Sequence, residues 1–530
     1  MSAWNAAWRA EALPALAACQ WDVIVVGGGI CGAGILREAA RRGWKCLLLE
    51  QRDFAWGTSS RSSKMIHGGL RYIAKGQLRL TRESVHERER LLHEAPGLVE
   101  PLSFIFAHYR GAFPGPRVFG GLLALYDALA GKRNHQYHAL QQLRYLAPGL
   151  QEQKLLGGSR FADAITDDAR LVLRVLGEAR AEGGEALNGL RVVELCREGE
   201  RVVGLLAEDG ESGRQLRFDS RVVVQATGAW SDRLRAPDQP VRIRPLRGSH
   251  LLLPAWRLPL AQAFTFMHGQ DGRPVFVFPW EGATVIGTTD LDHDQDLDQE
   301  ARIAAHEVEY LLAACAQQFP AARIEARDVL STWAGVRPVI RSGAAGTRPS
   351  DETREHALWL EPGSVTLAGG KLTTFRPLAL EVLRACASML GRPFEDAGGA
   401  VFAPLTEVPV AHLEPVQQRR LRGRYGRAWP RLATLFHELG EAGREPVGAS
   451  QTLGAELVFA CEHELVLHLD DLLLRRTRLG LLLPGGAAAE LPRIRALCQA
   501  RLGWDEARWE QEQQRYLALW QACYSLPATS

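Results

Sequence analysis

A strand–helix–strand unit occupies residues 21–51, WDVIVVGGGICGAGILREAARRGWKCLLLEQ. An uninterrupted apolar run at 23–26 comes before a glycine-rich turn, and a second apolar run at 46–49 ends at Glu50. Continuous apolar runs are typical of parallel strands that are buried on both faces. The segment therefore predicts a βαβ unit and an α/β fold that begins with a parallel sheet.

Three glycines of this unit, Gly27, Gly29 and Gly32, have the spacing of a dinucleotide-binding turn. One permits the turn, the next lets the backbone approach a pyrophosphate, and the last lets helix and strand pack closely. The helix N-terminus then offers N–H groups and a positive dipole to the phosphates. Glu50 can accept hydrogen bonds from a ribose diol, and its charge disfavours the 2′-phosphate of NADP. The fingerprint alone leaves NAD and FAD open.

Two later segments favour FAD. VVVQATGAW (222–230) is an apolar strand that runs into a small-residue turn, and SVTLAGGKLTTFR (364–376) repeats the pattern. A site that is assembled from distant parts of the chain suits a long, extended dinucleotide such as FAD. The residues that we expect at the cofactor in these segments are Ala226, Thr227, Gly228, Gly370 and Thr373.

Length and composition bound the remaining possibilities. A chain of 530 residues is too long for one hydrophobic core, and a formal net charge of +2 argues against a nucleic-acid binder. The nine cysteines include no C-x-x-C pair, so we expect no metal centre and a reducing compartment.

We expect a helical lead-in at 1–20, an FAD domain interleaved with a substrate domain at 21–400, and a helical domain at 401–530. The N-terminus lacks a signal-peptide pattern, so we expect an unexported protein without a spanning helix.

The segment TSSRSSKMIHGGLRYIAKG (58–76) concentrates hydroxyls and cations directly after the βαβ unit. One interpretation is a solvated loop, and the other is a lining for an anionic ligand. Gly68 and Gly69 would let the backbone pass close to a bound group where a side chain would intrude.

In order along the chain, the motifs GTSSRSSKMIHGGLRY, ATGAW, RGSHLLLP, FPWEGATVIGTTD, GVRPV, TREH and GGKLTTFRPLA resemble those of the FAD-dependent, quinone-linked glycerol-3-phosphate dehydrogenases. The resemblance covers most of residues 21–380. Cys31, Gln225 and Phe375 depart from the family pattern in ways that concern flavin packing. The resemblance implies a glutathione-reductase-like FAD-binding domain, a mixed-sheet substrate domain and a C-terminal helical cap.

The same resemblance implies the reaction, the oxidation of sn-glycerol 3-phosphate to dihydroxyacetone phosphate with hydride transfer to flavin N5. It also implies a peripheral protein on the inner face of the cytoplasmic membrane that passes electrons to a quinone. A homodimer is an open option. The resemblance further places one run of side chains at the flavin, namely Thr58, Ser59, Ser60, Ser63 and Lys64.

Candidate substrate-site residues follow from chemistry within these motifs. Guanidinium groups match phosphate oxygens, so Arg337 and Arg354 are expected to bind the phosphate. The resemblance implies that Arg71 and Tyr72 also face the substrate, and Lys371 can supply positive charge near the substrate or the flavin.

The general base stays open between two residues of this set. His67 titrates near physiological pH and is a natural proton acceptor, and Lys371 is the competing base. Arg337 completes the expected catalytic set.

Two alternative functions remain at this point, an oxidase that uses O₂ and a non-catalytic flavin-bound membrane protein. The arginine-rich segment 417–431 is interpreted either as a patch that meets anionic lipid or as a solvated helix face.

Overall fold

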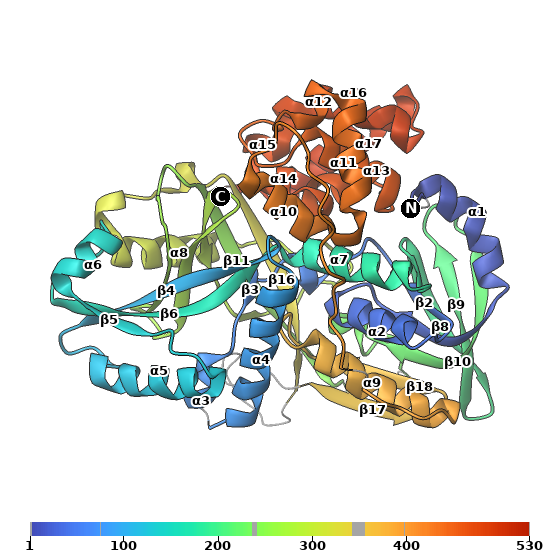
Figure 1. The fold of residues 1–530 in the computed structure, drawn as a ribbon, viewed down its shortest axis with the longest axis horizontal. Coiled ribbons are helices and arrows are strands. Elements are labelled where there is room, and N and C mark those ends of the chain that lie inside the picture. Colours follow the sequence, from blue (N-terminus) through green and yellow to red (C-terminus); the bar gives the residue numbers. More distant parts are fainter. Residues whose placement is uncertain (1–2, 75, 236–240, 342–355, 397, 529–530) are drawn as a thin grey trace.

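The computed structural model describes residues 3–74, 76–235, 241–341, 356–396 and 398–528. Two β-sheets lie beside each other, and a group of helices from the C-terminal part of the chain covers them on one side (Figure 1). The expected α/β fold with a mixed second sheet and a C-terminal helical cap is confirmed.

The first sheet contains the predicted βαβ unit at its centre. Its core strands β18, β10, β1, β2 and β7 are parallel, and β17 and the β8–β9 hairpin join in antiparallel fashion. The bounds are β1 (Gln20–Val26), β2 (Cys46–Leu49), β7 (Glu185–Leu187), β8 (Leu190–Glu198), β9 (Arg201–Asp209), β10 (Gln215–Gln225), β17 (Ala357–Glu361) and β18 (Ser364–Ala368).

Both faces of this sheet are covered, which explains the continuous apolar run in β1. Val23 and Val25 pack toward helices α2, α7 and α9, whereas Ile24 and Val26 pack toward α1 and the β8–β9 hairpin. The helices are α1 (Ala6–Ala17), α2 (Ile30–Arg41), α7 (Asp168–Ala181) and α9 (Phe375–Leu390). The carboxyl ends of β1, β2, β10 and β18 therefore meet at one edge of a rigid, buried sheet.

The second sheet is mostly antiparallel, with one parallel pairing between β12 and β4. Its strands come from segments that alternate along the chain with those of the first sheet. Their bounds are β3 (Met65–Ile66), β4 (Val99–Tyr109), β5 (Gln136–Ala139), β6 (Leu155–Thr166), β11 (Ile243–Pro254), β12 (Ala263–Met267), β13 (Pro274–Trp280), β14 (Ala283–Gly287), β15 (Leu291–Asp292) and β16 (Ser331–Ile340). The helices around it are α3 (Leu70–Ala74), α4 (Leu78–Glu94), α5 (Pro116–Ala130), α6 (Leu140–Leu146) and α8 (Ala305–Gln318).

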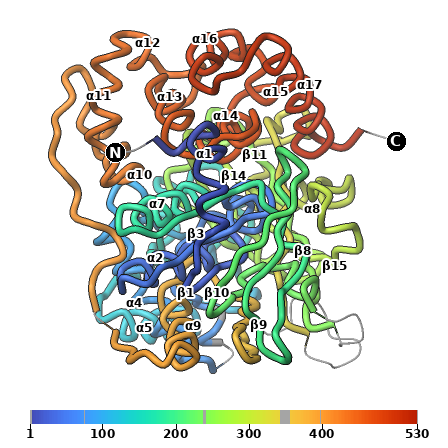
Figure 2. Tube along the Cα trace, turned by 90° about the vertical axis from the view of Figure 1, so that its right-hand side faces the viewer, coloured from blue at the N-terminus to red at the C-terminus, as the bar shows by residue number. Residues whose placement is uncertain are grey.

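The C-terminal part is a helical layer that Figure 2 shows at one end of the molecule, away from α9 and β9. Its helices are α10 (Pro415–Tyr425), α11 (Trp429–Leu439), α12 (Glu441–Arg444), α13 (Gly454–His463), the π-helix Asp471–Arg476, α14 (Leu479–Leu482), α15 (Pro484–Ala487), α16 (Leu491–Leu502) and α17 (Glu506–Cys523). Within the described ranges, every helix is too short or too polar to cross a membrane.

Buried ion pairs hold this layer against the loop after β2 and against the N-terminal end of α7. Arg476 Nη1 lies 2.6 Å from Asp53 Oδ2, and Arg478 Nη2 lies 2.9 Å from Asp167 Oδ1. Removing one partner from such a buried pair leaves an uncompensated charge and typically costs about 3–5 kcal/mol. The C-terminal helices are therefore a fixed part of the structure.

Candidate active site

The glycine-rich turn after β1 has the geometry that the sequence predicts. Gly27 has a φ of +110°, and a Cβ there would lie 2.6 Å from the carbonyl oxygen of Ala226. A Cβ on Gly32 would lie 1.9 Å from the carbonyl oxygen of Gly27. Because these neighbours are backbone atoms that have no room to move, both positions require glycine. The N-terminus of α2 can thus approach a ligand closely.

Glu50 follows β2 and faces the same turn. Its Oε2 accepts a hydrogen bond from the Gly28 N–H at 2.6 Å, and its Oε1 accepts one from the Arg52 N–H at 2.9 Å. Burial raises the pKa of the Glu50 carboxyl, while the two backbone N–H groups and the Arg52 charge act in the opposite direction. The carboxyl group is held in place beside the pocket, with acceptor capacity for a ribose hydroxyl.

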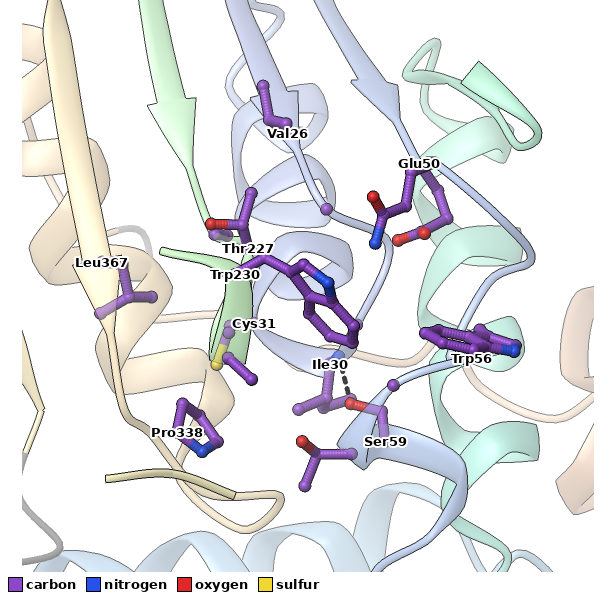
Figure 3. Close-up of a pocket in the computed structure, with 18 of the residues that line it drawn as sticks. Val26, Ile30, Cys31, Glu50, Trp56, Ser59, Thr227, Trp230, Pro338 and Leu367 are labelled. Carbon is purple, nitrogen blue, oxygen red and sulfur yellow. Dashed lines mark hydrogen bonds between the residues drawn. The ribbon is translucent and has the colours of Figure 1, made fainter. Parts of the chain in front are cut away.

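A pocket of about 490 Å³ lies along this edge of the first sheet (Figure 3). It extends from the ends of β1 and β2 to the turn after β18. Predicted cofactor residues that line it are Gly27, Gly29, Glu50, Thr58, Ser59, Ala226, Thr227, Gly228 and Gly370, and Lys371 lines it as well. Segments far apart in the sequence therefore build one elongated cavity.

The pocket fits a dinucleotide by its own chemistry. The hydroxyl oxygen of Thr227 is buried at the lining, and no described residue hydrogen-bonds to it. Such an orphaned polar atom is rare unless a ligand or water satisfies it. Together with the glycine cradle and Glu50, Thr227 supplies polar contacts at the point where parallel strands end, which is the usual dinucleotide position in this kind of sheet.

Other lining residues were missed from the sequence. Trp56 and Trp230 stand over the pocket with ring centroids 5.6 Å apart, and Figure 3 shows both indoles beside Ser59. Pro338 also lines the pocket, and so does Cys31, which the family resemblance had already linked to flavin packing. The only sequence signal for Trp230 was its place in ATGAW, since an isolated tryptophan has no pattern that separates a ligand contact from core packing.

The hydroxyl-rich stretch lies only partly in the pocket. Thr58 and Ser59 line the pocket, and Ser59 Oγ accepts a hydrogen bond from the Ile30 N–H at 3.0 Å. Ser60 is buried and its carbonyl oxygen accepts from Lys64 Nζ at 3.1 Å, while Ser63 Oγ lies 2.9 Å from His250 Nε2. Neither Ser60 nor Ser63 lies in the described lining of the pocket. Ser62 does line it, so the lining consists of Thr58, Ser59 and Ser62.

Lys64 has a different environment from the expected one. Its Nζ is fully buried, donates to Asp168 Oδ1 at 2.9 Å and lies 4.7 Å from the ring centroids of both Trp280 and Trp333. Burial lowers the pKa of Lys64 to about 8, although Asp168 acts against that shift. Lys64 joins the second sheet to α7 and is absent from the described pocket lining.

One candidate substrate residue, Lys371, lines the pocket in the turn after β18. Lys371 Nζ lies 3.8 Å from the centroid of the Tyr72 ring. Thr373 Oγ1 donates to the carbonyl oxygen of His67 at 3.4 Å. His67 comes just before α3 and Tyr72 lies within it, so the segment around α3 meets the turn after β18.

Arg337 lies on β16, next to the lining residue Pro338. Its Nη1 lies 3.0 Å from Asp290 Oδ1, and its Nη2 donates to Thr288 Oγ1 at 3.2 Å. The buried Asp290 carboxylate therefore orients the Arg337 guanidinium. Arg354 lies outside the described residues. Arg71 belongs to α3, and its side chain is also outside the description.

The arginine-rich segment 417–431 pairs with acidic side chains of the same chain. Arg424 is buried between Asp167 and Glu281, and the partly buried Arg420 pairs with Glu456. The other arginines of the segment also pair within the chain: Arg419 with Glu100, Arg422 with Glu407, Arg427 with Glu178, and Arg431 with Glu438. The segment thus serves mainly to hold α10 and α11 against the rest of the molecule.

A family model described as FAD dependent oxidoreductase matches residues 22–374, and one described as the C-terminal domain of alpha-glycerophosphate oxidase matches residues 365–509. The chain belongs to the FAD-dependent oxidoreductases, and its cofactor is FAD, as the sequence predicts. Within them it belongs to the glycerol-3-phosphate dehydrogenase family, because it is 33% identical to glycerol-3-phosphate dehydrogenase 2 of Mycobacterium tuberculosis (strain ATCC 25618 / H37Rv) over 97% of this chain and 90% of that protein.

Solved structures agree with this assignment. The glycerol-3-phosphate dehydrogenase of Bacillus halodurans complexed with FAD superposes with a TM-score of 0.76 at 27% identity, over 97% of this chain and 98% of that chain. The L-alpha-glycerophosphate oxidase of Mycoplasma pneumoniae, with FAD bound, superposes with a TM-score of 0.56 at 17% identity, over 72% of this chain and 97% of that chain. The second likeness concerns the fold alone.

Proposed function

We propose that the protein oxidises sn-glycerol 3-phosphate to dihydroxyacetone phosphate and passes the electrons to a membrane quinone. The observation that carries this proposal is that Lys371 lines the FAD pocket and lies against the ring of Tyr72, while Thr373 binds the backbone of His67. The names of the curated relatives support the choice of substrate.

The substrate phosphate needs cationic partners. Arg337 is the candidate arginine whose side chain the structure describes. Asp290 fixes one edge of its guanidinium, which orients the fork and leaves the side chain 23% exposed. An oriented guanidinium loses less entropy on binding a phosphate than a mobile one. Arg354 and Arg71 remain further proposed contacts from the sequence, with Tyr72 as a hydrogen-bond partner.

The C2 hydroxyl proton must be taken by a base, and we assign this role to His67. The face of the Tyr72 ring stabilises the ammonium form of Lys371, which suits an electrostatic role better than proton acceptance. Imidazole accepts protons near neutral pH without special tuning. Thr373 holds the backbone of His67, which fixes the position from which the imidazole acts.

When bound, FAD would supply the acceptor for the C2 hydride. It would also supply the route by which the electrons reach the second acceptor. The protein contributes binding and orientation through the glycine turn, Glu50, Thr58, Ser59 and Thr227. The indoles of Trp56 and Trp230 limit the access of water to this part of the pocket.

A quinone acceptor implies a protein that works at the cytoplasmic membrane surface. We propose a peripheral location on its inner face. An oxidase that uses O₂ is the second candidate, and the likeness to the Mycoplasma oxidase favours it only at the level of the fold.

The test is a steady-state assay of the purified holoprotein with sn-glycerol 3-phosphate and either a soluble quinone analogue or air. We expect rapid quinone reduction and little hydrogen peroxide in air. Peroxide formed at the rate of substrate oxidation would reassign the acceptor to O₂. Failure with both acceptors and with an artificial dye would overturn the substrate assignment.

A further inference from the structure

We propose that the loop between β15 and α8, residues 293–304, fixes two tryptophans in the wall of the FAD pocket and thereby sets how tightly FAD is held. Trp56 and Trp230 are called the tryptophan wall below. Asp298 and Glu300 of the loop are positioning residues that act through the two indoles. Retention of FAD depends on neither the substrate nor the second acceptor, so this role stands apart from the proposed reaction.

Each indole of the tryptophan wall donates its N–H to a carboxylate of this loop. Trp56 Nε1 donates to Glu300 Oε2 at 2.9 Å, and Trp230 Nε1 donates to Asp298 Oδ1 at 3.2 Å. The two acceptors are close neighbours in one loop, whereas the two tryptophans belong to the separate segments that follow β2 and β10. The indole N–H is the single polar group of a large flat ring, so its hydrogen bond selects one orientation of that ring. One loop therefore orients both rings.

Glu300 is held much more firmly than a carboxylate in a solvated loop. Its side chain is 6% exposed, and its Oε1 accepts from the guanidinium of Arg61 and from the hydroxyl of Tyr524. Tyr524 follows α17 directly, and its carbonyl oxygen accepts from the Thr332 N–H of β16 at 2.7 Å. Glu300 thus connects the tryptophan wall to the C-terminal layer.

The ring of Trp56 is fixed through its π face as well as through its N–H. The guanidinium carbons of Arg52 and Arg61 lie 4.2 and 4.8 Å from the ring centroid, within the range of a cation–π contact. Arg52 comes shortly after Glu50, the expected ribose contact. Figure 3 shows Trp56 on the same side of the pocket as Glu50, and Leu367 on the opposite side. Trp56 therefore belongs to the half of the pocket that would hold the adenosine of FAD.

The acidic side chains of the loop are neutralised by arginines, which makes them compatible with a pyrophosphate. Arg233 Nη2 lies 2.7 Å from Asp298 Oδ2 and 3.7 Å from Asp296 Oδ1, and Arg61 pairs with Glu300. Asp298 itself lines the pocket. Unpaired carboxylates at this position would repel the phosphates of FAD. The paired carboxylates can serve as acceptors for the indoles with much less of that repulsion.

The experiment measures the FAD dissociation constant of the holoprotein by equilibrium dialysis, with bound and free flavin quantified by absorbance. Glu300→Ala and Asp298→Ala remove the two acceptors, whereas Glu300→Gln and Asp298→Asn keep an acceptor oxygen for the indole. Asp294→Ala, at an exposed carboxylate of the same loop, is the matched control. The melting temperature at saturating FAD shows whether each variant is folded.

We expect the FAD dissociation constant to rise at least about tenfold in Glu300→Ala and about fivefold in Asp298→Ala, since each loses a hydrogen bond to a charged group. The amide variants should stay within about threefold of the wild type, and Asp294→Ala within about twofold. Unchanged dissociation constants in both alanine variants would overturn the proposal.

Double-mutant cycles separate the positioning of the tryptophans from a general structural role of the loop. Trp56→Phe and Trp230→Phe keep an aromatic ring and remove the indole N–H. In the matching background, Glu300→Ala or Asp298→Ala should weaken FAD binding further by less than about twofold. An undiminished loss in the phenylalanine backgrounds would show that the carboxylates act without the indoles, and the proposal would be rejected.

Glu300→Ala leaves the buried Arg61 without its anionic partner, and such a change can prevent folding. The pair of Asp298 and Trp230 then decides the question, because the Asp298 side chain is 37% exposed and its removal leaves no buried charge. Coupling between Asp298 and Trp230 in the FAD dissociation constant supports the proposal, and strict additivity overturns it.

Discussion

Arg337 and Asp290 form a salt bridge in which the guanidinium nitrogen lies 3.0 Å from the carboxylate oxygen. The Asp290 side chain is 1% exposed and the Arg337 side chain 23% exposed, so a buried anion orients a partly accessible cation. Arg273 also approaches Asp290, at 3.5 Å. Among the residues that the structure describes, this arrangement makes Arg337 the best candidate for binding the substrate phosphate.

Replacing Arg337 with alanine should raise KM for sn-glycerol 3-phosphate about tenfold to 100-fold, because a hydrogen-bonded charge pair with the phosphate is lost. FAD should stay bound, since no predicted cofactor contact is removed. Activity toward glycerol itself, however low, should change little. Arg327→Ala, on an exposed arginine, is the control. Loss of flavin with unchanged KM in the remaining holoprotein would make Arg337 a folding residue.

A substitution at Gly248 tests the role of Arg337 without removing its charge. A Cβ at this position would lie 2.5 Å from Arg337 Nη2 and 2.7 Å from Thr288 Oγ1. These atoms end flexible side chains, so Gly248→Ala should displace the guanidinium without unfolding the protein. We expect KM to rise, but less than in Arg337→Ala, with the melting temperature nearly unchanged. A normal KM in a folded variant would contradict the role of Arg337.

The local part of the site could be predicted from the sequence. The requirement for glycine at Gly27 and Gly32, the position of Glu50, and the FAD cofactor depend on neighbours in one βαβ unit or on ordered motifs. Lys64 could not be placed in this way. Its partner Asp168 lies 104 residues away in the sequence, and Trp333 lies farther still. A single sequence does not reveal which residues at such separations are in contact.

The arginine-rich segment 417–431 shows the same limit. Its composition is that of a cationic surface. Arg424 is nevertheless buried, because it forms ion pairs with Asp167 and Glu281 from distant parts of the chain. Both interpretations from the sequence assumed exposed arginines. Burial of a charged side chain depends on a partner that the local pattern does not reveal.

The assignment of the base can be tested by comparing His67→Ala with Lys371→Met. If His67 accepts the proton, its loss should slow flavin reduction about 10²- to 10⁴-fold and leave substrate affinity within a few-fold. Lys371→Met should weaken binding as well as rate, because a positive charge is lost. Stopped-flow absorbance over a range of substrate concentrations separates the two effects. Normal reduction in His67→Ala, with a large rate loss in Lys371→Met, would transfer the role to Lys371.

Lys64 predicts a pH dependence of stability. Burial lowers its pKa to about 8, below the ordinary lysine value of 10.5. Between these values the unfolded chain binds more protons than the folded one, so the free energy of unfolding should rise with pH through this window, by up to about 3 kcal/mol. Below pH 8 Lys64 contributes no slope, because it is protonated in both states.

Denaturant titrations between pH 7 and 10.5 measure this effect. Lys64→Met should remove most of the rise, while Lys154→Met, at an exposed lysine, should preserve it. The same slope in Lys64→Met and wild type would show that the pKa of Lys64 is not lowered by burial.

The central claim is that this FAD site oxidises sn-glycerol 3-phosphate. Anaerobic mixing of the purified yellow protein with that substrate, followed by flavin absorbance, tests it most directly. We predict prompt bleaching of the oxidised flavin band with sn-glycerol 3-phosphate, and none with glycerol at equal concentration. A flavin that stays oxidised would keep the cofactor and the fold but contradict the substrate, and Arg337 and Lys371 would then serve a different anion.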